Sequence, residues 1–364
     1  MRDSMFRKGI FLLIIMQMGT VIATGQSKKY LNDMAAFLGG VQKAQDVSDL
    51  SEYLKTSEYA SYQKNISQAW EQYASKNLGA IHEWRKTHLS PAASKHLVYA
   101  YSGPDLINAL LFFPQMKEYT LAALEKPGSI DSLEEMKKKD VAGELKEIQK
   151  TLKTFFKVNY FRTNEMKEDI RQNSFTSVSN LMFFFLARLG YEIESFRTFE
   201  ISKNGELLDK INAKGYNHGF EIFFKKPGEK ELKRVRYFRV NFFDDSFRSS
   251  PFRLYLNQYK NFNAMLKAAS YLMHETNSTL IRGFLASRAD FILQDDSGIP
   301  IKYFPEKEWD FKYYGAYRVL KMFLNVHQAK LARYLKENNA GSLPFQYGYG
   351  ALVRTPNLMV GKRK

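Results

Sequence analysis

The chain has 364 residues, of which 45% are hydrophobic and 25% are charged, and it carries a formal net charge of +16. This length and hydrophobic content exclude an intrinsically disordered chain and suit one large domain or two ordinary ones. The chain has no cysteine, which excludes disulfides, lipid attachment at a cysteine and a cysteine nucleophile. The fold must therefore be held by its hydrophobic core.

Residues 1–25 have the pattern of a secretory signal peptide. Three basic residues precede the apolar run Gly9–Met16, and the small-x-small sequence Ala23-Thr24-Gly25 places Gln26 at the new N-terminus. The alternative is a membrane anchor, but the apolar run is shorter than the roughly 20 residues of a spanning helix. We therefore expect an exported protein, periplasmic or associated with the cell envelope, that has no transmembrane span after cleavage.

The mature chain would still be strongly basic, because residues 1–25 contain three basic residues and one acidic residue. A basic surface attracts lipid headgroups, lipopolysaccharide, acidic glycans or nucleic acid. The alternative is a solvated surface that only keeps the protein soluble, and the wide spread of Lys and Arg favours it. Because export disfavours nucleic acid, we expect any partner to be an envelope protein or an anionic envelope component.

Residues 26–90 form an N-terminal helical segment, since apolar residues recur there at intervals of three and four. The main domain is predicted to cover residues 91–364. It begins with a strand, a helix and a second strand, which together predict a βαβ unit. These three elements are His96–Tyr101, Pro104–Phe113 and Tyr119–Leu124.

The middle of the chain predicts helices followed by an antiparallel meander. Val141, Leu145, Ile148 and Leu152 mark the buried face of a surface helix, and Ser177–Leu189 is a second helix. The strands of the meander are joined by the turn signals Lys203-Asn204-Gly205 and Pro227-Gly228. They are Tyr191–Ile201, Glu206–Ile211, Gly219–Lys225 and Glu231–Phe243.

The last third mixes helices and strands, and the whole pattern predicts an α+β fold. We expect a mixed sheet with one βαβ-like unit and an antiparallel meander, preceded by the N-terminal helices. The predicted helices are Asn263–His274, Ser278–Ser287 and Val319–Glu337. The predicted strands are Ala289–Leu293 and Ile301–Phe304, followed by an aromatic segment at Trp309–Tyr317 and an extended edge at Gln346–Leu352.

The first candidate site is the turn Ser102-Gly103-Pro104-Asp105 after the first strand. A helix N-terminus favours an anion, and Glu125 lies near the end of the next strand, where nucleoside-binding folds place a ribose-binding acid. However, a full Gly-x-Gly-x-x-Gly is absent. The alternative is purely structural: Ser102 caps the helix, Pro104 starts it and Asp105 complements its dipole.

The second candidate site is Gln294–Pro300, which follows another predicted strand. Asp295, Asp296 and Ser297 offer oxygen ligands suited to Ca²⁺ or Mg²⁺, and Asp244-Asp245 would complete such a site if the fold brought them together. Paired carboxylates also serve as acid and base in glycoside hydrolysis. The structural alternative is an ordinary hairpin turn.

Familiar catalytic templates are absent. The histidines at positions 82, 88, 96, 218, 274 and 327 lack the spacing of zinc ligands. The sequence also contains no Gly-x-Ser-x-Gly elbow and no Walker loop. Ordinary hydrolase classes are therefore disfavoured.

Both turns lie within segments that resemble an uncharacterised family of exported bacterial envelope proteins. The resemblance spans roughly residues 95 to 360 and implies an envelope protein, with no activity, cofactor or catalytic residue. Its motifs are Tyr99–Asp105, Phe112–Pro114, Leu124-Glu125, Ala269–His274 and Ile292–Pro300.

The sequence thus favours a non-catalytic envelope protein that binds a ligand or partner. One alternative is a divalent-metal-dependent hydrolase acting on an envelope glycan or phosphoester, and another is a nucleoside-type cofactor site at Ser102 and Glu125. Convergence of the two turns in one cleft would favour the enzyme, whereas separate exposed turns would favour the binder. The candidate ligand-binding residues are Ser102, Asp105, Glu125, Gln294, Asp295, Asp296 and Ser297.

Overall fold

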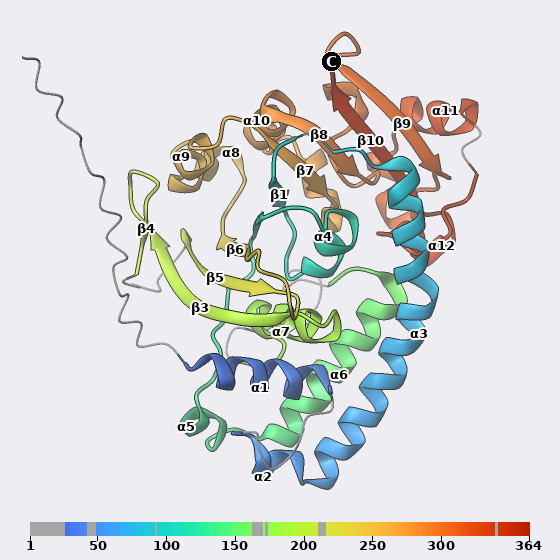
Figure 1. Cartoon of the computed structure of the whole chain (residues 1–364). Helices are drawn as coiled ribbons and strands as arrows, with labels where there is room; N and C mark the ends of the chain where they lie inside the picture. Colours follow the sequence, from blue (N-terminus) through green and yellow to red (C-terminus); the bar gives the residue numbers. More distant parts are fainter. Residues whose placement is uncertain are drawn as a thin grey trace, which may run out of the picture.

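The computed structural model describes residues 26–41, 49–91, 93–161, 170–171, 174–209, 216–338 and 341–364, so the predicted signal peptide lies outside the described residues. One mixed sheet of ten strands crosses this part of the chain, in the order β4-β3-β5-β6-β2-β1-β7-β8-β10-β9 (Figure 1). The strands are β1 (His96–Ala100), β2 (Glu118–Ala123), β3 (Glu192–Ile201), β4 (Leu207–Leu208), β5 (His218–Lys225), β6 (Lys233–Arg239), β7 (Phe262–Leu266), β8 (Ala289–Gln294), β9 (Trp309–Gly315) and β10 (Asn357–Arg363).

The five central strands β6, β2, β1, β7 and β8 are parallel. Antiparallel strands flank this region on both sides. Strands β5, β3 and β4 continue the sheet beyond β6, and strands β10 and β9 continue it beyond β8. From β1, the chain first adds β2 and then β6 on one side of the sheet, and it later adds β7 and then β8 on the other side. The strand order therefore reverses between β1 and β7, and α/β proteins bind ligands at the carboxyl ends of strands at such a switch point.

Helices cover both faces of the sheet. The helices are α1 (Lys28–Gly39), α2 (Ser51–Leu54), α3 (Ser57–His88), α4 (Leu106–Phe112), α5 (Leu133–Met136), α6 (Val141–Val158), α7 (Val178–Arg188), α8 (Asp244–Phe247), α9 (Pro251–Asn257), α10 (Thr279–Arg288), α11 (Ala329–Glu337) and α12 (Gly350–Val353), with 3-10 helices η2 (Ala269–His274), η3 (Ile301–Tyr303) and η4 (Lys321–Val326). None of the helices in this part of the chain combines the length and apolarity that a bilayer span requires.

Two hydrophobic cores lie on opposite faces of the sheet. Leu97 and Tyr99 of β1 belong to one core, and Val98 and Ala100 belong to the other, because successive side chains of a strand point to opposite faces. The first core is formed with α1, α3, α4, α6 and α7, and the second with α8 to α11. The crossover helices α4 and α10 therefore lie on opposite faces, as in a doubly wound sheet.

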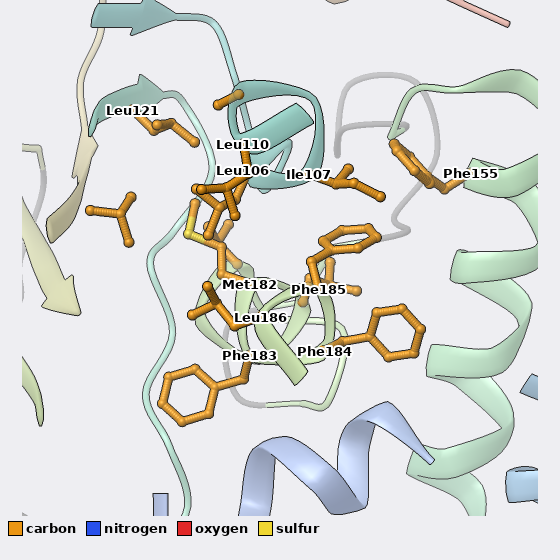
Figure 2. Packing of buried hydrophobic residues seen from close by; sticks show 14 of the residues in the cluster. Leu106, Ile107, Leu110, Leu121, Phe155, Met182, Phe183, Phe184, Phe185 and Leu186 are labelled. Carbon is orange, nitrogen blue, oxygen red and sulfur yellow. The ribbon is translucent and has the colours of Figure 1, made fainter. Parts of the chain in front are cut away.

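Helix α7 lies at the centre of the first core. Figure 2 shows it below α4 and beside α6, with Phe183, Phe184 and Phe185 pointing in different directions from its axis. The Phe185 ring lies 5.4 Å from the ring of Phe155 on α6. Helix α1 packs against α7, and the long helix α3 packs against α6 (Figure 1). The N-terminal helices therefore complete the core of the sheet domain.

The structure confirms the predicted α+β class, the N-terminal helices and the βαβ unit formed by β1, α4 and β2. The predicted antiparallel strands are present, but β4 lies outside β3, so β5 pairs with β3 rather than with β4. The predicted helix Asn263–His274 is wrong, because β7 occupies its first half and η2 the second. β7 is buried along its whole length. A short run buried on both faces shows no alternation, so its sequence does not distinguish a strand from a helix.

Three predictions near the C-terminus also need correction. Ile301–Phe304 is not a returning strand, since η3 begins there, and β8 pairs instead with β10. The segment Gln346–Leu352 is not an extended edge, because α12 starts within it. The predicted helix Val319–Glu337 is divided into η4 and α11, since the Gln328 backbone N–H donates to the Tyr317 hydroxyl instead of continuing a helix.

Candidate functional site

The two predicted turns meet at the carboxyl ends of the parallel strands. Ser102 and Asp105 follow β1, Glu125 follows β2, Lys267 follows β7 and Ser297 follows β8, and all five line one small cleft. The cleft lies at the switch point between β1 and β7. Its volume is about 30 Å³, which is room for one or two water-sized groups.

A buried ion pair forms one wall of the cleft. Lys267 Nζ lies 2.6 Å from Asp105 Oδ2 and also donates to the backbone carbonyl of Asn159, at 2.6 Å. Asp105 accepts further hydrogen bonds from the Tyr99 hydroxyl and the Asn108 amide, each at 2.8 Å. Both charges therefore have opposite charge and hydrogen-bond partners, as burial of charged groups requires.

Asn159 is placed in the cluster by the way α6 ends. It caps the helix in the left-handed conformation, with φ of 56°, and its backbone N–H bonds to Phe155. The Asn159 side-chain oxygen accepts hydrogen bonds from both Lys267 and Asn108, at 3.1 Å each. The apolar face of α6, which packs into the first core, thus fixes a polar residue beside the ion pair.

Asp295 lies just behind the cleft wall. Its Oδ1 accepts hydrogen bonds from the backbone N–H and the hydroxyl of Ser297, while its Oδ2 is buried and makes no hydrogen bond among the described residues. Burial raises the pKa of the Asp295 carboxyl to about 7, and repulsion from Asp296 adds to the increase. The nearby charge of Lys267 opposes it. Burial therefore favours the protonated form of the Asp295 carboxyl.

Asp296 points away from the cleft and ties other segments together. Its carboxylate accepts hydrogen bonds from the Tyr271 hydroxyl at 2.6 Å and from the Asn357 amide at 2.9 Å. Its backbone carbonyl accepts a further hydrogen bond from the Gln328 amide. Burial also raises the pKa of Asp296, and the two side-chain hydrogen bonds oppose that shift. Asp296 thus links η2, β10 and the start of α11.

The backbone around the cleft is constrained. Tyr101, Asn159, Ser270 and Tyr271 all have φ between 55° and 58°, a conformation that residues other than glycine seldom adopt. Such residues cluster at functional sites because the surrounding structure must hold them in place. Gly348 also has positive φ, and a Cβ there would lie 2.0 Å from Asp295 Oδ2. Only glycine fits at this position.

Aromatic side chains form the outer wall of the cleft. Tyr160 and Tyr349 both line it, with ring centroids 4.6 Å apart. Phe323 of η4 packs against Tyr349 and Tyr271, with ring centroids 5.2 Å and 4.8 Å apart. Aromatic rings therefore lie beside the polar groups of the cleft.

The candidate residues from the sequence fall into two groups. Ser102, Asp105, Glu125 and Ser297 line the cleft, and Asp295 supports it. The other two lie elsewhere: Asp296 links segments, and the Gln294 side chain bonds within its own turn, to the backbone of Ile299. The two turns therefore converge, which by itself favours an enzyme, but the second turn contributes only Ser297 to the lining of the cleft, with Asp295 behind it.

The capping interpretation of the first turn is wrong for Ser102 and Pro104, whereas Asp105 does lie at the N-terminus of α4, where a negative charge complements the helix dipole. The hydroxyl of Ser102 bonds to the carbonyl of Gly103 rather than to the helix, and α4 begins after Asp105. Asp105 occupies the N-cap position but makes no side-chain capping bond, because its carboxylate faces Lys267. The hairpin interpretation of the second turn is also wrong, since η3 rather than a strand follows it.

The predicted Ca²⁺ or Mg²⁺ site does not fit these residues. The ammonium of Lys267 already neutralises Asp105, and both oxygens of Asp296 accept hydrogen bonds. Asp244 lies apart from the cleft, where its carboxylate bonds to Thr279 and Leu280 at the start of α10. Among the described residues, no group of three or more His, Asp or Glu is placed to hold a metal ion.

Sequence reasoning missed Lys267, Asn108 and Asn159. The position of Lys267 after the apolar run Phe262–Leu266 was a usable signal, because it places a charged residue at a strand end. Because this run falls within the predicted helix Asn263–His274, Lys267 does not stand out as a residue at a strand end. Asn108 and Asn159 lie within or at the end of helices and carry no local pattern.

Comparison with known proteins adds no assignment. No protein-family model matches the chain, and no curated protein is similar to it in sequence.

Proposed function

We propose that this is an exported binding protein whose cleft at the β1–β7 switch point captures a pair of hydroxyl groups on a small ligand, such as the diol of a sugar. The observation that carries the proposal is the convergence of Ser102, Asp105, Glu125 and Lys267 from three parallel strand ends around one cavity. Such a switch point is the usual ligand position of doubly wound sheets.

The groups that line the cleft suit hydroxyl recognition. Each hydroxyl both donates and accepts a hydrogen bond, so a diol requires carboxylate acceptors together with a donor. Glu125 and Asp105 supply carboxylate acceptors, and Ser102 supplies a hydroxyl. The Lys267 ammonium already donates to Asp105 and to both oxygens of Asn159, so it positions Asp105 rather than binding the ligand. Glu125 also stands where doubly wound sheets hold the hydroxyls of a ribose, near the end of the second parallel strand.

The size of the cleft supports a diol rather than a whole ligand. A volume of about 30 Å³ admits two oxygen atoms. The rest of the ligand would extend outward past the rings of Tyr160 and Tyr349, whose faces suit the apolar face of a sugar ring.

The experiment compares methyl ribofuranoside, which carries a vicinal diol, with its 2-deoxy analogue, which lacks one of the two hydroxyls. We expect the diol to raise the thermal midpoint in a concentration-dependent way and the deoxy sugar to raise it less, because a ligand bound only by the folded state stabilises it. Glu125→Gln should reduce the effect of the diol. The matched control is Glu229→Gln, at an exposed turn between β5 and β6.

Equal effects of the two sugars, or no effect of either, would contradict the proposal. The comparison of the two sugars uses only the wild-type chain, so it holds even if Glu125→Gln lowers stability by itself. A loss of stabilisation in Glu229→Gln as large as in Glu125→Gln would place binding outside the cleft.

Export is a second part of the proposal, and it rests on the sequence of residues 1–25. The basic start, the short apolar run Gly9–Met16 and the sequence Ala23-Thr24-Gly25 support it. The absence of cysteine from all 364 residues agrees with it, since such a chain needs no control of thiol oxidation outside the cytoplasm.

Acid–base catalysis on the bound ligand is a second candidate function, favoured by one observation. The pKa of Asp295 is raised to about 7 beside the cleft, which is the range that suits a general acid or base at neutral pH. If Asp295 is catalytic, prolonged incubation with the glycoside should give new products by NMR. Asp295→Asn should then still be stabilised by the diol but give no product.

A further inference from the structure

Helix α6 presents a row of exposed lysines on its outer face. Lys146, Lys150, Lys153 and Lys157 are all exposed and recur at intervals of four, three and four residues, which places them on one side of the helix. Glu147 is the single acidic residue between Leu145 and Val158. Among the described residues, no salt bridge involves any of these four lysines.

One exposed apolar side chain borders this row, and two more are exposed on η4. Leu352 of α12 is 43% exposed and borders a shallow hollow together with Lys150, Lys153 and Lys157. On η4, Met322 is 68% exposed and Leu324 is 66% exposed, the two highest values among the large hydrophobic residues described. Lys321 precedes them and is also exposed.

Contacts connect the two apolar sites. Phe323, between Met322 and Leu324, packs inward onto Tyr349, which directly precedes α12. Tyr349 in turn packs against Tyr160, just beyond the end of α6. These contacts link η4 through Tyr349 to the start of α12 and through Tyr160 to the end of α6. We call the four lysines together with Leu352, Met322 and Leu324 the basic-apolar face.

We propose that the basic-apolar face docks on an anionic lipid bilayer, with Met322 and Leu324 inserted at the headgroup boundary and the α6 lysines held at the surface. Interfacial attachment uses this combination of a few exposed apolar side chains with a set of Lys or Arg residues. Charge complementarity carries the choice of partner: Glu58 lies near Lys146, but none of the four lysines forms a salt bridge among the described residues.

The apolar residues distinguish a bilayer from a soluble polyanion. An acidic glycan would be satisfied by the lysine row alone and would leave Met322 and Leu324 in water. Insertion of these two side chains into the boundary of the bilayer removes their apolar area from water, which is favourable. Because Tyr160 and Tyr349 also line the cleft, this docking would hold the cleft mouth near the membrane surface.

Vesicle co-sedimentation tests the proposal. The protein is purified with the N-terminus it carries after expression, and every variant shares that N-terminus. Binding is compared between vesicles of phosphatidylcholine alone and vesicles containing equal parts of phosphatidylglycerol. The test variants are Lys150→Gln/Lys157→Gln and Met322→Gln/Leu324→Gln. Their matched controls are Lys203→Gln/Lys230→Gln and Leu208→Gln/Leu232→Gln, which change exposed residues of the same kinds near the other end of the sheet.

We expect the wild type to bind the anionic vesicles roughly tenfold more tightly than the neutral ones, and each test variant to weaken that binding roughly fivefold or more. The control variants should change it less than about twofold, with unchanged thermal midpoints throughout. Equal losses in test and control variants would overturn the proposal. A loss in the lysine variant without a loss in the Met322/Leu324 variant would also overturn it, because that result indicates a soluble polyanion.

Discussion

The ion pair between Lys267 and Asp105 ties several elements together around the cleft. Both side chains are almost fully buried, and each is surrounded by hydrogen-bond partners on separate elements: Tyr99 on β1, Asn108 on α4 and Asn159 at the end of α6. Breaking such a pair by removing one partner leaves an uncompensated charge, which is strongly destabilising. The pair therefore fixes the relative positions of three elements at the site.

Asp295 gives a testable pH dependence. Its pKa in the folded state is about 7, whereas an aspartate in the unfolded chain titrates near 4. The folded state thus binds the proton more tightly, so the stability contributed by protonated Asp295 is complete below about pH 4 and is lost as the pH rises through about 7. We expect Asp295→Asn to gain stability relative to the wild type between pH 5 and pH 8.

Urea unfolding of both proteins across that range measures the effect. We expect the unfolding free energy of Asp295→Asn to rise relative to that of the wild type as the pH increases. A difference that stays constant with pH would show that Asp295 is already ionised at pH 5. In that case Asp295 would no longer be a candidate general acid or base.

Among the elements, α6 connects the core to both the cleft and the proposed basic-apolar face. Leu145, Ile148 and Leu152 on its inner face are fully buried, as predicted. The predicted Val141 lies at the first turn and packs against the same core while remaining partly exposed. The outer face carries the lysine row, and the C-terminal end positions Asn159 in the cleft. One amphipathic helix therefore serves packing, surface charge and site geometry.

The inner face of α6 predicts a large loss of stability on truncation. Leu145→Ala removes a buried side chain and leaves a cavity, so we expect it to lower the unfolding free energy by about 2–5 kcal/mol. Gln149→Ala, at a half-buried position on the same helix, should change it by less than about 0.5 kcal/mol. Thermal or urea unfolding of the two variants supplies the comparison. Indistinguishable stabilities would mean that the inner face contributes little to the core.

The parallel region that carries the cleft is paired at both of its edges. The antiparallel strands β5 and β10 flank β6 and β8, so both edges of the parallel region are paired. The cleft lies at the carboxyl ends of the parallel strands, where Tyr160 and Tyr349 line it. This arrangement concentrates carboxylates inside a chain whose net charge is +16.

At the scale of the whole molecule, the proposed export depends on cleavage of residues 1–25. We expect the protein recovered from the envelope of an exporting bacterial host to begin at Gln26, because the apolar run is too short to anchor it. Intact-mass spectrometry distinguishes the two forms directly. A mature chain that still carries Met1–Gly25 would contradict cleavage and favour the membrane anchor.

The sequence by itself determined the features that depend on local patterns. The three- and four-residue spacing on α6, the turn signals of the meander and the strand-turn-helix after His96 all follow from short-range geometry, so they were predicted. The placement of Asp105 and Ser297 at strand ends was predicted for the same reason. Each of these signals lies within a few residues of the structure that it specifies.

Only the tertiary structure decided which strands pair and what meets at their ends. β7 reads as a helix from its sequence, and β10 was missed, because burial on both faces removes the alternation that marks a strand. The partner of Lys267 could not be found locally, since Asp105 and Asn159 reach it only through the order of β1 and β7 and through the end of α6. Hydrogen bonds between distant strands determine that order, so the cleft is a property of the fold rather than of any one motif.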